Sequence, residues 1–191
     1  YLSKPIFNDD VEALKVYSKQ SLYIGFPRIL LQVVIKHFLP YADDLNDANY
    51  HIKTKDDPSL EELRKFWDVT LPYLQHKLNF DAILSGNFVY VSQQELFRIA
   101  QKHNIPALVL YKEGMFPTDR SEDVKGIFYT TKKFLSDKIL FYNEGIREIL
   151  INSELPGLTP EKTAVVGVPR FDHSFSTQKI SSAQSGNKQI V

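Results

Sequence analysis

Residues 79–111 read NFDAILSGNFVYVSQQELFRIAQKHNIPALVLY and contain the pattern that decides the fold. A short apolar run at 81–84 ends in Ser-Gly-Asn, and a second apolar run occupies 107–111. Between them, Ser92–Glu95 has the form of a capping box, which marks the start of a helix. Two apolar strands joined by one helix form a right-handed βαβ unit, so the stretch predicts two parallel strands.

The same alternation continues toward the C-terminus. Residues 138–142 form a third apolar run, and Asn143 is placed to cap the helix that follows it. A fourth run at 163–167 stops shortly before Pro169, which cannot donate a ladder hydrogen bond. We therefore predict an α/β fold with a Rossmann-like parallel sheet flanked by helices, in which residues 80–172 supply regular βα units.

Residues 1–79 are mostly helical by pattern. Pro27 suits the first turn of a helix, and one row of side chains is predicted to form the apolar face of that helix: Ile29, Leu30, Val33, Val34, His37 and Phe38. A second capping box at Ser59–Glu62 opens another helix. The apolar stretch 22–39 is interrupted by charges, whereas a membrane span needs about 20 apolar residues. It predicts a buried helix or, as the alternative, a peripheral membrane contact.

Residues 173–191 are rich in Ser, Gln and Lys and poor in apolar side chains, which predicts an interdomain linker. The chain begins with Tyr1 and not with methionine, and Lys188–Val191 resembles the start of a strand. We therefore expect residues 1–172 to be an N-terminal domain truncated at its start. Residues 173–191 are expected to lead into a C-terminal domain that the sequence does not include.

The composition excludes several classes of function. Lys plus Arg number 23 and Asp plus Glu number 23, so no overall positive charge favours nucleic acid. The absence of cysteine excludes disulfides and thiolate chemistry, and the five scattered histidines lack metal-site spacing. The glycine-rich motifs of dinucleotide-binding and P-loop proteins are absent, as is the nucleophile elbow. We expect no metal and no cofactor.

In an open α/β sheet, ligands bind at the carboxyl edge, so the residues that follow the strands are candidates for the site. Two carboxylates, Glu113 and Asp172, are expected to face one crevice with Arg170, a set that suits proton transfer and recognition of an anion. The other candidate ligands are Asn87, Gln94, Asn143 and Glu144. Each has a structural alternative: Asp172 can cap the next turn, Arg170 can pair with it, and Asn143 can cap its helix.

Several short motifs together resemble one group of enzymes. They are residues 81–84, the Gln-Gln-Glu helix start, Lys112-Glu113-Gly114, Tyr142-Asn143-Glu144 and the stretch VGVPRFD at 166–172. The set resembles the bacterial surface-carbohydrate glycosyltransferases with two facing Rossmann-like domains, called the GT-B fold. The Gly-x-Pro-Arg-x-Asp segment is similar to that of teichoic-acid glycerophosphotransferases and retaining β-Kdo transferases. The resemblance covers about residues 79 to 172.

The resemblance implies that the chain is the acceptor-side half of a GT-B enzyme that transfers a sugar from a nucleotide-activated donor to a glycan or lipid-linked acceptor. The donor is expected mainly on the C-terminal domain. By analogy Glu113 acts as acid or base, and Asp172 is the second carboxylate, a nucleophile if the enzyme retains the anomeric configuration. Arg170 and the four amide and acidic residues named above contact substrate. Such an enzyme acts in the cytoplasm, at the inner face of the cytoplasmic membrane.

Two other classes of protein fit the same pattern. A related enzyme that hydrolyses or epimerises a nucleotide sugar can use the same crevice, with water or a C–H bond as the reactant. A non-catalytic, flavodoxin-like binding module is the other class, and in it Glu113 and Asp172 are structural.

Overall fold

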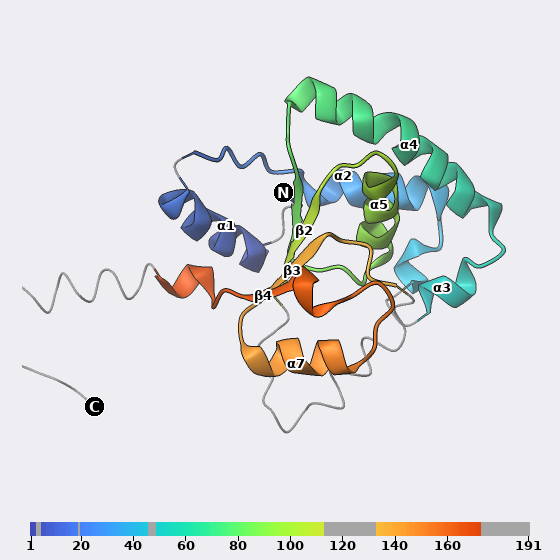
Figure 1. The fold of residues 1–191 in the computed structure, drawn as a ribbon. Helices are drawn as coiled ribbons and strands as arrows, with labels where there is room; N and C mark the ends of the chain where they lie inside the picture. Colours follow the sequence, from blue (N-terminus) through green and yellow to red (C-terminus); the bar gives the residue numbers. More distant parts are fainter. Residues whose placement is uncertain (3–4, 19, 46–48, 113–132, 173–191) are drawn as a thin grey trace, which may run out of the picture.

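The computed structural model describes residues 1–2, 5–18, 20–45, 49–112 and 133–172. Four parallel strands form one sheet in the order β1-β2-β3-β4, and helices flank it (Figure 1). The strands are β1 (Ile83–Ser85), β2 (Ala107–Leu110), β3 (Lys138–Phe141) and β4 (Thr163–Val165). The predicted α/β, Rossmann-like fold is confirmed.

Both faces of the sheet are covered, as the uninterrupted apolar character of the strands predicts. Successive side chains in a strand point to opposite faces. Ile83, Val109 and Ile139 belong to the main core, whereas Leu110 of β2 and Tyr142 just after β3 belong to a second core on the other face. Helices must therefore pack on both sides.

The edge of the sheet beside β1 continues through two short segments near the N-terminus. The Leu2 amide donates to the Leu84 carbonyl at 2.9 Å, and Leu2 pairs in parallel with Phe26. Leu2 therefore lies between Phe26 and β1 in the sheet. The chain runs from Leu2 through α1 (Pro5–Tyr17) to Phe26 at the outer edge, and it then crosses back over Leu2 to reach β1. The direction of winding therefore reverses between Leu2 and β1, which is the topological switch point of a doubly wound sheet.

The helices on the two faces follow from this winding. Helix α1 supplies Phe7 and Val11 to the second core. On the opposite side, α5 (Val91–Lys102) contacts β2, and α7 (Glu144–Asn152) contacts β3 and β4. Helices α2 (Arg28–Phe38) and α4 (Pro58–Leu78) pack against α5 and against each other on that side (Figure 1). The short helix α3 (Tyr50–Lys53) and the 3₁₀ turns η1 (Ala42–Asp44) and η3 (Pro160–Lys162) complete the described elements.

The helix starts differ from two of the predicted caps. Helix α4 begins at Pro58, so its N-cap is Asp57, whose carboxylate accepts from the Ser59 amide at 2.8 Å. Helix α5 begins at Val91 after Tyr90, which has no capping side chain, so the predicted capping box at Ser92 is wrong. The predicted cap of α7 is confirmed. The start of α5 therefore retains amides that no side chain satisfies.

Protonation of Asp57 is expected to destabilise the fold. The Tyr41 hydroxyl and then the Ser59 amide donate to this carboxylate and hold its pKa below the ordinary value. Because the folded-state pKa is the lower one, the stabilisation is present above about pH 4 and is lost as the pH falls through the folded-state pKa. Urea unfolding at several pH values is expected to show a weaker acid dependence for Asp57→Asn than for the wild type. The exposed neighbour Asp56 supplies the control, and equal acid dependence in Asp57→Asn and Asp56→Asn contradicts the prediction.

Candidate functional site

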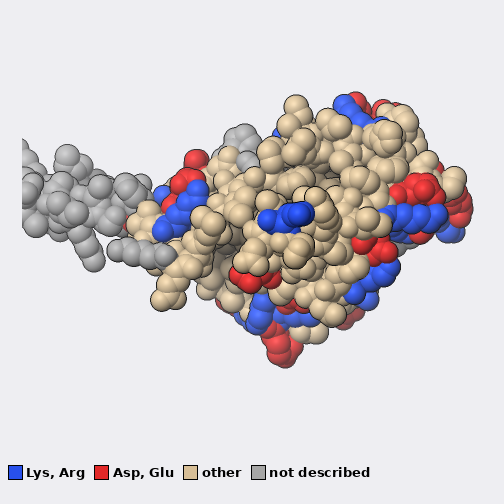
Figure 2. Space-filling model, turned by 90° about the horizontal axis from the view of Figure 1, so that it is seen from above, with Lys and Arg blue, Asp and Glu red and all other residues tan. Residues whose placement is uncertain are grey.

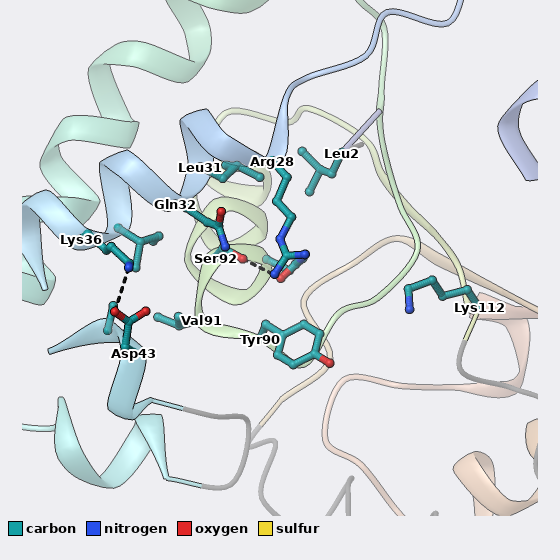
Figure 3. A pocket seen from close by; sticks show the side chains of 13 residues that line it. Leu2, Arg28, Leu31, Gln32, Lys36, Asp43, Tyr90, Val91, Ser92 and Lys112 are labelled. Atoms are coloured by element: carbon teal, nitrogen blue, oxygen red, sulfur yellow. Dashed lines mark hydrogen bonds and ion pairs between the residues drawn. The ribbon is translucent and has the colours of Figure 1, made fainter. Parts of the chain in front are cut away.

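A cavity of about 510 Å³ opens beside the switch point of the sheet. Its lining comes from α2, from the turn that leads into α5, from Leu2 and from Lys112, which follows β2 (Figure 3). Tyr90 and Lys112 both lie just beyond the carboxyl ends of their strands, so the cavity is at the edge of the sheet where α/β proteins bind ligands. Its volume is within the range of small-molecule sites.

The cavity combines an apolar wall with a positively charged rim. Leu2, Leu31 and Ile35 are buried and line it. Arg28, Lys36 and Lys112 also line it, against one carboxylate, that of Asp43. Lys36 Nζ pairs with Asp43 Oδ2 at 2.8 Å, and Arg28 makes no ion pair with a described residue. The rim therefore favours an anionic ligand.

Two of the predicted ligand residues, Asn87 and Gln94, hold the turn between β1 and α5. The Asn87 side-chain oxygen accepts from the Val89 amide at 2.8 Å, and the Gln94 side-chain nitrogen donates to the Phe88 carbonyl at 2.6 Å. Both side chains are buried. These two bonds stay within the protein and stabilise the turn that brings Tyr90 and Ser92 to the cavity.

Two others, Asn143 and Glu144, lie at the start of α7 and not in the lining of the cavity. The Asn143 side-chain oxygen accepts from the Ile146 amide at 2.9 Å and caps the helix. Glu144 is exposed and pairs with Arg147 one helical turn later. The contacts that the structure shows for them stabilise a helix start.

Arg170 makes a buried ion pair with a residue that the sequence did not single out. Its Nη1 lies 2.7 Å from Asp10 Oδ2, and the Tyr142 hydroxyl donates to the same oxygen at 2.5 Å. Asp10 is fully buried, and the Arg170 guanidinium also lies over the Tyr142 ring. This cluster joins α1, the end of β3 and the helical turn that starts at Pro169. Burial, and then the bond to Asp10, raises the pKa of the Tyr142 hydroxyl above its ordinary value.

The structure describes one of the two predicted catalytic carboxylates, Asp172. Glu113 lies outside the described residues. Asp172 is exposed in the helical turn that begins at Pro169, and it is not a lining residue of the cavity. The predicted site residues that the structure describes do not line the cavity, whose lining includes Arg28, Gln93 and Lys112.

A second surface, apolar and outside the cavity, lies on α2 and α4. The predicted apolar face of α2 is not the buried one, because Leu31 and Ile35 are buried whereas Ile29 and Val33 are 66% and 60% exposed. On α4, Val69 is also exposed. Figure 2 looks down on the side that carries α4 and shows a broad uncharged field. Membrane contact at this surface stays a prediction, and no described helix is long and apolar enough to span a bilayer.

Among the described residues, no group of three or more His, Asp or Glu side chains is arranged to hold a metal ion.

A scan against protein-family models found no match, and searches of curated proteins and of solved structures found none either. The fold is therefore supported by the structure, and the resemblance to GT-B glycosyltransferases stays a prediction from the sequence motifs.

Proposed function

We propose that this chain is the acceptor-side half of a bacterial glycosyltransferase, which moves a sugar from a nucleotide-activated donor to a surface-glycan acceptor. The observation that carries the proposal is the cavity at the switch point, where the carboxyl ends of β1 and β2 meet a positively charged rim. Donors of this class and many lipid-linked acceptors carry phosphate, so a cationic cavity suits either substrate.

The position of Glu113 in the sequence supports its proposed role as acid or base. Lys112 lines the cavity, and Glu113 is the next residue of the chain. In the proposed mechanism the Glu113 carboxylate removes a proton from an acceptor hydroxyl. Asp172 stays the proposed second carboxylate. We assign Arg170 to the support of this edge through Asp10, because its guanidinium is already paired.

The test is a transfer assay on the protein encoded by the whole reading frame. The protein is incubated with a panel of nucleotide sugars, with and without phosphate-linked glycan acceptors, and the products are analysed by mass spectrometry. The proposal expects a glycosylated acceptor. Free sugar formed equally fast without acceptor identifies a hydrolase instead, and an isomerised nucleotide sugar identifies an epimerase. No turnover with any donor contradicts all three enzymes.

A non-catalytic, flavodoxin-like binding module is the second candidate. The order Phe26, Leu2, β1, β2 and β3 corresponds to the 2-1-3-4-5 order of flavodoxin-like sheets, with the cavity at the equivalent switch point. The internal contacts of Asn87, Gln94 and Arg170 also suit a module without chemistry. Saturable ligand binding without turnover by the whole protein favours this candidate.

A further inference from the structure

We propose that the cavity binds the phosphate group of a phosphate ester, and that the start of α5 together with Arg28 forms the phosphate-binding end. This inference deepens the proposed function by naming the chemistry of the ligand, and the site it describes exists equally in a binding module. The residues that carry it are Arg28, Val91, Ser92, Gln93 and Lys112, all of which line the cavity.

Helix α5 begins without a side-chain cap. It has 12 residues and no acidic residue in its first turn. Within the described chain, the amides of Gln93 and Gln94 reach the Tyr90 carbonyl, whereas those of Val91 and Ser92 have no acceptor. These two amides lie at the cavity, at the positive end of the helix dipole. Such a start favours an anion with several oxygen atoms.

Gln93 supports the site independently of the helix start. Its side chain lines the cavity although the residue is only 2% exposed. Its carbonyl oxygen accepts from the Ser92 hydroxyl at 2.7 Å, and its amide nitrogen meets no acceptor in the part of the chain that the structure describes. This amide nitrogen can therefore donate to an acceptor atom that a ligand brings into the cavity.

The cavity carries positive charge on one side and an apolar surface on the other. Figure 3 shows the Arg28 side chain extending from α2 toward Ser92 and Tyr90, and Lys112 lines the same cavity. Arg28 makes no ion pair with a described residue, so its planar fork can bind two phosphate oxygens. Leu31 and Ile35 offer an apolar wall for the organic part of an ester. Inorganic phosphate alone leaves that wall uncovered.

The experiment is calorimetric titration of the chain with inorganic pyrophosphate, CDP and glycerol 3-phosphate, with cytidine as the uncharged control. Ser92→Asp places a carboxylate at the helix start, which suits the helix dipole but repels phosphate. We expect this variant and Arg28→Ala each to weaken binding of the phosphates by about tenfold or more, with the melting temperature preserved. Lys65→Ala removes an exposed cation on α4, paired with Glu62, and is the matched control.

The titration and the transfer assay test the phosphate site and the proposed transferase separately. Tighter binding of CDP or of glycerol 3-phosphate than of pyrophosphate identifies the nucleotide or the glycerol ester as the source of the phosphate. No binding of any phosphate, or binding unchanged in both cavity variants, overturns the inference. Phosphate binding without sugar transfer by the whole protein overturns the proposed transferase and leaves the phosphate site standing. Sugar transfer that is insensitive to Ser92→Asp and Arg28→Ala overturns the phosphate site and leaves the proposed transferase standing.

Discussion

Replacing Asp10 with alanine is expected to lower the free energy of unfolding by about 3–5 kcal/mol. Asp10 is fully buried, and its carboxylate pairs with Arg170 and accepts from the Tyr142 hydroxyl. The substitution leaves a guanidinium whose side chain is 15% exposed without its partner, and a buried hydroxyl without its acceptor. An uncompensated buried charge is one of the few single changes with an effect of this size. Urea unfolding monitored by circular dichroism measures it.

Asp9→Ala is the matched control, because Asp9 is the neighbouring carboxylate on α1 and is exposed. It is expected to change stability by about 0.5 kcal/mol or less. The double variant Asp10→Ala, Arg170→Ala is expected to lose less than the sum of its two single variants, because each single change already breaks the same pair. Additive losses, or an Asp10→Ala variant as stable as Asp9→Ala, contradict the buried pair.

Glu113→Gln is expected to reduce the rate of sugar transfer by the whole protein by at least ~10², the scale of general acid–base catalysis. The amide keeps the size of the side chain and removes its ability to accept a proton. The measurement is the turnover number with the donor and acceptor identified in the transfer assay. Glu148→Gln on the exposed side of α7 controls for the loss of one negative charge. Near-wild-type turnover in Glu113→Gln removes this carboxylate from the mechanism.

The fold could be predicted from the sequence because its strands are continuous apolar runs with clear breaks. Runs predicted at 107–111 and 138–142 became β2 and β3 with their ends within one residue. Both strands are covered on two faces, so their apolar pattern is strong. The extension through Leu2 and Phe26 could not be predicted in the same way, since a single bridged residue has no periodicity. The switch point could not be predicted from the sequence for that reason.

The site was less predictable, because residue type does not show whether a polar side chain faces a ligand or its own backbone. Asn87 and Arg170 have the chemistry of ligands, yet in the structure they satisfy partners inside the protein. Asp10 was missed although the spacing of Phe7, Val11 and Leu14 marks the apolar face of α1, and an acidic residue next to that face is a signal of a buried pair. Arg28 is one of the charges that interrupt the apolar stretch 22–39, and this position in the sequence does not indicate that it lines a cavity.

Amide chemical shifts show directly whether ligands bind in the cavity at the switch point, the proposed functional site. The isotope-labelled chain is titrated with CDP and, separately, with glycerol 3-phosphate. We expect the largest changes at the amides of Val91 and Ser92 and at the side-chain amide of Gln93, which belong to residues that line the cavity. Changes centred instead on the capped start of α7, at Asn143 to Arg147, or no saturable change at α5, would contradict it.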